Sequence, residues 1–425
     1  MLFDVRLPNV LSQSHTRESA HLQSLFQKKH LVFLDHLLIL FTVKVGKGKR
    51  QMKGKPVIPP VYLTATYQFH ESDDLIDVVQ NRSGFLYSRW DNPSVVEVEN
   101  TFAKLEGYDH ALGFSSGMAA ITTAIMANIS AGNRIVAIRE IYGGTFELLN
   151  DILTKLGIEI VFVSCWKTEQ LLGEIEKGLS ILYLETPTNP LLRVVDVIPL
   201  AKAAHKKGAA VLLDSTFASP INQKPLHLGV DIVIHSGTKY LGGHHDITAG
   251  FVGCNEQHFD RIWTYRKILG GVMDPMTAFL TLRGLRTLEL RIQRQNQNAM
   301  QIAEFLNNQK KIKAVHYPGL KSHPDHEIAT RQMTGFGGML SFEVDADFEG
   351  TKRFMDHLNV IKLATSLGGV TSLANQPITN THAALSPEDR AKAGVSESLV
   401  RLSVGIENTD LLIEDLKQAL GIVYK

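Results

Sequence analysis

The sequence has few cysteines, almost no net charge and no long apolar run, and each absence removes a class of protein. Its 425 residues include two cysteines, Cys165 and Cys254. These are too few for a disulfide framework and are not spaced as metal ligands, which favours a reducing compartment and predicts a cytoplasmic protein. The net charge of +1 provides no overall field that would attract nucleic acid or an anionic membrane. With 44% hydrophobic and 20% charged residues, the composition is that of a globular protein with a large core.

The most apolar stretch near the N-terminus, residues 31–43, is interrupted by Asp35 and His36. A membrane-spanning helix needs about 20 apolar residues, so no membrane anchor is predicted. A basic run follows this stretch instead of preceding it, which argues against a secretory signal. We interpret residues 1–55 as an extension outside the folded domains, either disordered or an artefact of translation upstream of Met52, and a transit peptide is the alternative.

Short apolar runs alternate with helical patterns from about Arg134 onwards. Strands that are apolar on both faces and alternate with helices predict an α/β fold with a parallel sheet covered on both sides. After Gly284 the pattern changes to a polar helix and spaced strands, which predicts a smaller α+β domain. No repeat of 20–50 residues is visible, which excludes a solenoid or propeller. The expected strands cover 134–138, 158–163, 181–185, 209–214, 231–236, 249–254, 337–344 and 399–406, and the expected helices cover 146–156, 197–207 and 286–307.

Ligands of open parallel sheets bind beyond the carboxyl ends of the strands, so the residues that end each strand are the first candidates. One strand ends in Asp214, which Ser215 and Thr216 follow. A carboxylate there is partly desolvated and needs a hydrogen-bonded or cationic partner. On its own, a helix cap or a loop salt bridge is the more ordinary explanation of this carboxylate.

The next strand leads into Ser236, Gly237, Thr238 and Lys239. Hydroxyls and a lysine at this edge can bind a phosphate, and a lysine with a lowered pKa can also act as a nucleophile. For this motif in isolation, a surface lysine beside a turn is an equally good explanation.

A third element, SSGM at 115–118, precedes a helical run. Glycine at a helix start lets free backbone N–H groups approach an anion. The spacing matches neither a nucleotide P-loop nor a dinucleotide fingerprint, so both are excluded. A helix N-terminus for phosphate, a strand-end carboxylate and a lysine 25 positions after it together match the needs of a pyridoxal 5′-phosphate site.

The same residues resemble the pyridoxal phosphate enzymes of Cys/Met metabolism, which include cystathionine γ-synthase, cystathionine γ-lyase, methionine γ-lyase and homoserine sulfhydrylases. The resemblance runs from about Pro56 to Leu420 and is strongest towards cystathionine γ-synthases and γ-lyases between Tyr317 and Val344. It rests on the motifs PPVYLTATY (59–67), YSRWDNPS (87–94), SSGMAA (115–120), YGGT (142–145), ETPTNP (185–190), DSTFASP (214–220), HSGTKYLGGHHD (235–246), SLGG (366–369) and RLSVGIE (401–407).

The resemblance implies the aspartate aminotransferase-like fold type I and a role for each matched residue around the cofactor ring. Lys239 would form the imine with the cofactor and shuttle protons. Asp214 would pair with the pyridinium nitrogen, with Thr216 close to the ring. Tyr142 would stack on the ring face and assist proton transfer, and Asn189 would donate a hydrogen bond to the ring hydroxyl.

The resemblance also implies how the phosphate and the substrate are held. Arg401, with Ser366, would bind the α-carboxylate of an amino-acid substrate through its two-pronged guanidinium group. The phosphate would be bound by the amides of Gly117 and Met118, by Ser236 and Thr238, and by Tyr87 and Arg89 from a neighbouring subunit. The implied assembly is a dimer at least, and a dimer of dimers by resemblance. The implied domains are an arm at 56–110 that serves the neighbouring site, a large domain at 111–300 and a C-terminal domain at 301–425.

The predicted function is γ-replacement or γ-elimination of the cystathionine γ-synthase or γ-lyase type, with O-acetyl- or O-succinylhomoserine sulfhydrylase and methionine γ-lyase as alternatives. Glu147 and Thr371 stand where many cystathionine-handling relatives have an arginine and a glutamate, so recognition of the distal end of the substrate is expected to differ. The stretch 381–394 also resembles homoserine sulfhydrylases and methionine γ-lyase, whereas Gly144 replaces a cysteine typical of methionine γ-lyases.

Two further readings of the sequence are weaker. A metal site is not expected, because neither the pair His244 and His245 nor the pair His323 and His326 has the spacing of H-E-x-x-H. The alternative of another class is a catalytically inert scaffold, and it is disfavoured because a scaffold has no need of the lysine, its carboxylate partner and the arginine together.

Overall fold

The computed structural model describes residues 54–379 and 394–423. The chain divides into the units Met1–Ile58 and Pro59–Lys425, and the fold below is that of the second unit. The interpretation of residues 1–53 and the resemblance of residues 381–393 fall outside the described residues.

The first domain is built on a seven-stranded sheet in the order β1-β7-β6-β5-β4-β2-β3. Neighbouring strands from β6 through β3 run parallel, whereas β7 is antiparallel to both of its neighbours. This confirms the predicted α/β class with a mostly parallel sheet. The strands are β1 His110–Phe114, β2 Arg134–Ile138, β3 Glu159–Val163, β4 Ile181–Glu185, β5 Ala210–Asp214, β6 Ile232–Ser236 and β7 Gly250–Cys254.

The apolar periodicity did not predict β1, which lies at the edge of the sheet, pairs with β7 and forms an isolated bridge from Phe114 to Val272. The Gly113 N–H in this strand donates to the Glu99 carboxylate at 2.7 Å instead of to a second strand. The helix expected at 146–156 also differs. It starts earlier, as α5 Gly143–Glu147, and continues as a π-helical turn, Leu148–Leu153, and a 3₁₀ turn, Thr154–Leu156.

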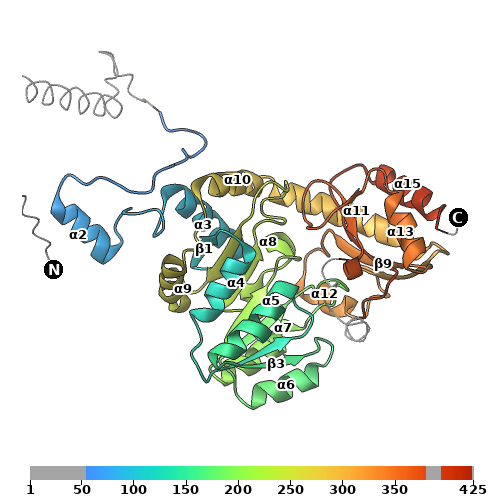
Figure 1. Cartoon of the computed structure of the whole chain (residues 1–425), viewed down its shortest axis with the longest axis horizontal. Coiled ribbons are helices and arrows are strands. Elements are labelled where there is room, and N and C mark those ends of the chain that lie inside the picture. The colour runs from blue at the N-terminus through green and yellow to red at the C-terminus, as the bar shows by residue number, and fades with distance from the viewer. Residues whose placement is uncertain (1–53, 380–393, 424–425) are drawn as a thin grey trace, which may run out of the picture. The chain divides into compact units, whose positions relative to one another are not determined.

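Helices pack against this sheet and complete the layered architecture (Figure 1). The central strands β4 and β5 are almost completely buried, which explains their continuous apolar runs. Cys165 and Cys254 are both buried free thiols. The helices of this part are α2 Ser72–Asn81, α3 Pro93–Glu106, α4 Gly117–Met126, α6 Thr168–Glu176, α7 Val197–Lys206, α8 Ser219–Asn222, α9 Glu256–Leu269 and α10 Pro275–Leu285.

A second, five-stranded sheet in the order β10-β11-β12-β9-β8 forms the smaller C-terminal α+β domain, as predicted. The domain boundary expected between residues 300 and 301 falls inside the long helix α11 and stays a prediction. The elements are α11 Leu288–Asn307, β8 Ile312–His316, α12 His326–Gln332, β9 Met339–Val344, α13 Phe348–Asp356, β10 Lys362–Leu363, β11 Leu373–Asn375, β12 Leu399–Ser403 and α15 Thr409–Leu420.

Residues 54–379 and 394–423 contain neither a candidate membrane-spanning helix nor a candidate metal cluster. In this part of the chain, none of the helices has the length and apolar character needed to cross a bilayer. The same residues contain no cluster of three or more His, Cys, Asp or Glu side chains that could hold a metal ion.

Candidate active site

The carboxyl ends of neighbouring strands form the floor of a cavity of about 390 Å³. Glu185 at the end of β4 lies in register with Asp214 at the end of β5, and Ser236 ends β6. The structure brings into this cavity every site residue that the sequence predicted except Tyr87 and Arg89. The predicted residues that line it are Gly117, Met118, Tyr142, Asn189, Asp214, Thr216, Ser236, Thr238, Lys239, Ser366 and Arg401.

Lys239 follows β6 and lies between the two domains. Its Nζ donates a hydrogen bond to Ser366 Oγ at 2.9 Å. Burial, with a smaller contribution from the positive charge of Arg401, lowers the pKa of Lys239 to about 8, although Asp214 acts in the opposite direction. Near pH 8 about half of the Lys239 side chains are therefore neutral amines, the form that can attack a carbonyl or accept a proton.

Asp214 is 7% exposed, and burial raises the pKa of its carboxyl group. Its Oδ1 accepts the Thr216 N–H at 3.0 Å, while Thr216 Oγ1 accepts the Ser236 N–H at 2.9 Å. These two bonds fix the ends of β5 and β6 to each other. A cation placed against Asp214 would counter the cost of keeping the carboxylate ionised there.

The N-terminus of α4 supplies the anion-binding side of the cavity. Ser116 caps the helix by accepting the Ala119 N–H at 3.1 Å, so the first-turn amides of Gly117 and Met118 remain for a ligand. A Cβ on Gly117 would lie 3.1 Å from the Ser236 Cβ and 3.2 Å from its hydroxyl. Glycine therefore leaves this hydroxyl and the helix N-terminus side by side.

Arg401 on β12 reaches the cavity from the smaller domain and is 4% exposed. Its Nη1 donates to Asn189 Oδ1 at 3.0 Å, and its Nη2 donates to the Ser366 carbonyl at 3.3 Å. Burial lowers the pKa of Arg401 to about 10, so it stays a cation at neutral pH. Ser366 has a φ of 76°, and Gly368 has a φ of 77° where a Cβ would meet the Tyr240 nitrogen at 2.7 Å. This turn needs left-handed backbone in order to place Ser366 beside Lys239.

Glu185 was not among the site residues predicted from the sequence. This residue lines the cavity, and its Oε2 accepts the Tyr142 N–H at 2.7 Å. The signal was present in the sequence, because Glu185 ends the apolar run 181–185 just as Asp214 ends the run 209–214.

Tyr87 and Arg89 lie outside the cavity within the described part of this chain. Tyr87 is 41% exposed, and the Arg89 guanidinium lies 5.5 Å from its ring centre. Arg89 also donates a hydrogen bond to the Lys267 carbonyl on α9. The segment just after them is anchored, since Arg266 donates to the Trp90 carbonyl and the Asp91 carboxylate, each at 3.0 Å.

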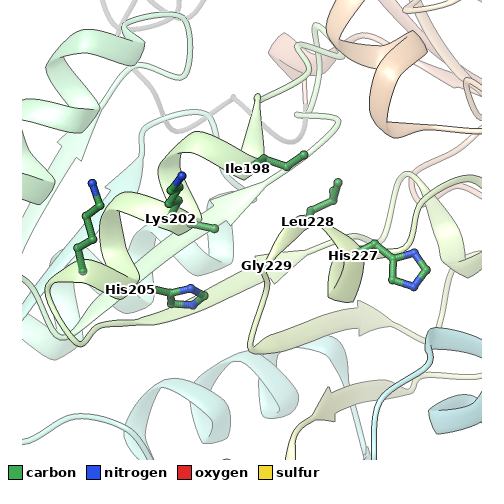
Figure 2. A pocket seen from close by; sticks show the side chains of 8 residues that line it. Ile198, Lys202, His205, His227, Leu228 and Gly229 are labelled. Carbon is green, nitrogen blue, oxygen red and sulfur yellow. The ribbon is translucent and has the colours of Figure 1, made fainter.

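A wider cavity of about 570 Å³ lies between α7 and the short helix Pro225–Leu228. Figure 2 shows Lys202 and His205 projecting from α7 and His227 and Leu228 from the short helix. The described residues that line this cavity include none that the sequence predicted for the site, and His205 is paired with Asp231 at 2.9 Å. The larger volume alone therefore does not mark the candidate active site.

Comparison with known proteins identifies the family. The family described as Cys/Met metabolism PLP-dependent enzyme matches residues 41–421. This chain belongs to that family. The match covers both domains and every residue that lines the smaller cavity.

Relatives with assigned activities are similar over most of the chain. Cystathionine γ-synthase 1 from Nicotiana tabacum is 41% identical over 90% of this chain and 72% of its own length. L-methionine γ-lyase from Fusobacterium nucleatum is 41% identical over 85% of this chain and 92% of its own length. A solved structure of cystathionine γ-synthase from Xanthomonas oryzae in complex with cystathionine has a TM-score of 0.82 at 37% identity, over 87% of this chain and 94% of that chain.

The residues present fit the cofactor of this pyridoxal phosphate-dependent family. Lys239 provides an amine with a lowered pKa, Asp214 a buried carboxylate for a protonated ring nitrogen, and the N-terminus of α4 a site for a phosphate. A Cβ at position 117 would fill the space beside Ser236. Because Gly117 has no side chain, this space is open to an anion at the N-terminus of α4.

Proposed function

We propose that the chain is a pyridoxal phosphate enzyme that catalyses γ-replacement or γ-elimination on a sulfur amino acid or an O-acylhomoserine, as cystathionine γ-synthases and γ-lyases do. One observation carries the proposal. The Lys239 amine lies in a single cavity with the buried Asp214 carboxylate and the buried Arg401 guanidinium, and its Nζ bonds Ser366. This arrangement combines a nucleophilic base with a partner for a cationic ring and a binding group for a carboxylate.

Each residue has a distinct task in the proposed reaction. Pyridoxal phosphate, when bound, supplies an aldehyde that condenses with amines and a ring that takes up electrons from the substrate. Lys239 removes the proton from the substrate α-carbon and returns protons to later positions, which its pKa of about 8 allows near neutral pH. Asp214 keeps the ring nitrogen protonated, and Arg401 orients the amino acid by its α-carboxylate.

Loss of the γ-substituent needs a second proton transfer beside the substrate. Lys239 and Tyr142 both line the cavity, and either can move a proton there. Tyr142 immediately precedes α5 and is 47% exposed, so it can meet a ligand at the cavity mouth.

The distal end of the substrate is where this chain differs from many cystathionine-handling relatives. Glu147 on α5 is exposed, and Thr371 follows the SLGG turn. Glu147 is absent from the described lining of the cavity, but an acidic residue near its mouth would repel a carboxylate on the acyl group of an O-acylhomoserine. Among acyl donors, this favours O-acetylhomoserine over O-succinylhomoserine.

A substrate panel tests the proposal. Cystathionine, methionine, and O-acetyl- and O-succinylhomoserine are each offered with cysteine or sulfide, and thioether products and 2-oxobutanoate are measured. Thioether formation with cysteine identifies a synthase, 2-oxobutanoate from cystathionine a γ-lyase, and sulfide-dependent homocysteine formation a sulfhydrylase. A protein that binds the cofactor but converts none of them, or that remains colourless, is an inert homologue and contradicts the proposal.

The active unit in this proposal is at least a dimer, and a dimer of dimers by family resemblance. Tyr87 and Arg89 are both exposed, and neither lines the cavity of the described part of their own chain. Arg266 anchors the segment that follows them. They are therefore available to complete the phosphate site of a second copy. The proposed location is the cytoplasm, for which a chain with two buried free thiols is suited.

An arm variant tests the shared site. Arg89→Ala should release the cofactor without unfolding the chain. The matched control is Arg82→Ala, another arm arginine, which pairs with Asp260 at 2.8 Å and should leave cofactor occupancy unchanged. Full occupancy in Arg89→Ala, or equal losses in both variants, would show that the arm does not complete a neighbouring site.

A further inference from the structure

We propose that Glu185 is a positioning residue that fixes the backbone of Tyr142, and through it the aromatic ring at the mouth of the cavity. This inference rests on the proposed function and deepens it, because it concerns how the cofactor pocket is held in shape. Glu185 is not proposed to touch a reacting atom.

Glu185 lies at the end of a buried strand, beside Asp214. It is the last residue of β4, is 5% exposed and is paired in register with Asp214. Its Oε2 accepts the Tyr142 N–H at 2.7 Å. Glu185 also accepts the backbone N–H of Asn189, whose side chain bonds Arg401.

Tyr142 depends on this support because its own packing is slight. The side chain is 47% exposed and belongs to the first residue before α5, a helix of five residues. A Cβ on Gly144 would lie 2.8 Å from the Tyr142 ring carbon Cε1, so the ring lies directly against that glycine. The position of such a short helix depends on its backbone hydrogen bonds. The bond from the Tyr142 N–H to Glu185 connects it to the end of the central strand β4.

The charge of Glu185 fits a supporting role. Burial, followed by the neighbouring charge of Asp214, raises the pKa of Glu185 well above its usual range, while the N–H groups of Tyr142 and Asn189 oppose this shift. The two N–H groups that Glu185 accepts, from Tyr142 and Asn189, each need an acceptor oxygen. A glutamine at position 185 would match the shape of the native group while offering one acceptor atom instead of two.

The chain contains a close control for this glutamate. Glu140 lies two residues beyond the end of β2 and accepts the Cys165 N–H and the Ser164 hydroxyl proton, both at 2.7 Å. It thus holds a loop in the same way as Glu185, but it is absent from the described lining of the cavity. Glu140→Gln makes the same chemical change away from the site.

The experiment measures the dissociation constant of pyridoxal 5′-phosphate for the protein stripped of cofactor and its unfolding free energy without cofactor. We expect Glu185→Gln to weaken cofactor binding about three- to tenfold, as the loss of one hydrogen bond does, and Glu140→Gln to leave binding unchanged. In a Tyr142→Ala background the effect of Glu185→Gln should fall below about twofold, because its target ring is gone.

The outcomes separate this inference from the proposed function. Failure of the unmodified protein to bind pyridoxal phosphate would overturn both. Normal binding by the unmodified protein and by Glu185→Gln, or an effect of the same size with and without the Tyr142 ring, would overturn the role of Glu185 alone. Should Glu185→Gln lower stability by as much as Glu140→Gln does, the binding difference between them still decides the question.

Discussion

The two walls of the candidate active site are built in different ways. On the wall from the large sheet, Asp214 and Ser236 end neighbouring strands, and hydrogen bonds through Thr216 join these strand ends. On the wall from the smaller domain, Ser366 and Arg401 come from a turn and a strand of a different sheet. Local sheet geometry determines the positions of the residues on the first wall. The positions of those on the second wall depend on contacts between the two domains.

Those bridging contacts are specific. Arg193, just beyond the ETPTNP segment, forms a two-pronged pair with Asp325, in which the Nη2–Oδ1 distance is 2.9 Å. Ser341 Oγ donates to the Pro190 carbonyl at 2.7 Å. Because Asn189 precedes Pro190 and bonds Arg401, these contacts determine how the two walls meet.

The largest effect should come from the base on the first wall. Lys239→Ala should lower kcat by about 10²- to 10⁴-fold, the usual contribution of a general acid–base group, without loss of folding. Activity assays and thermal unfolding test this, with the exposed Lys202→Ala as the control. If Lys239→Ala retained more than a tenth of the activity, Lys239 would not be the catalytic base.

A smaller effect is expected from the second wall. Arg401→Ala should raise KM for an amino-acid substrate by about 10- to 100-fold, because a charged hydrogen bond to the carboxylate is lost. Arg401→Lys should recover only part of this loss, since an ammonium lacks the two-pronged geometry. Unchanged KM in both variants would exclude Arg401 from substrate binding.

The contact between the domains can be weakened by itself. Asp325→Asn should lower the unfolding free energy by about 1–3 kcal/mol, because it leaves the Arg193 guanidinium with a poorer partner at a mostly buried site. The matched control is Asp196→Asn, whose partner Arg331 has a side chain that is 61% exposed, and this change should cost less than about 1 kcal/mol. Equal costs would contradict the special role of the Arg193–Asp325 pair.

The smallest expected effect is on the pH dependence of cofactor loading, which tests whether Arg401 on the second wall influences Lys239 on the first. Only the neutral Lys239 amine reacts with an aldehyde, so the rate of cofactor loading should increase with pH and level off above about 8, the pKa of Lys239. Because the charge of Arg401 helps to lower this pKa, Arg401→Ala should move the midpoint to higher pH. Stopped-flow loading between pH 6 and 10 would show this shift, and a midpoint that does not move would mean that the two groups are not coupled.

The same contrast explains how much could be predicted from the sequence. The strands of the large sheet other than β1, and the strand-end positions of Asp214 and Lys239, follow from apolar runs and from the rule that parallel strands gather their carboxyl ends at one edge. In the second sheet β9 and β12 were expected, whereas β8, β10 and β11 were not. Glu185 ends its strand in the same way as Asp214 but was not predicted as a site residue. The early start of α5 was also missed, because two glycines begin that helix.

The second wall could not be derived from periodicity. Ser366 lies 127 positions from Lys239, and its contact depends on left-handed backbone and on packing between domains. Only the resemblance of the SLGG and RLSVGIE motifs indicated Ser366 and Arg401. A pattern along the chain predicts elements, but a contact between distant loops is decided by the way that the elements pack.

The central claim is that residue 239 binds the cofactor. The purified protein would be treated with borohydride, digested, and searched by mass spectrometry for a lysine that carries a pyridoxyl group. We predict that the modification is found on the peptide that contains Lys239, and that Lys239→Ala abolishes it. A modification on another lysine, or none in a protein saturated with pyridoxal phosphate, would contradict the account.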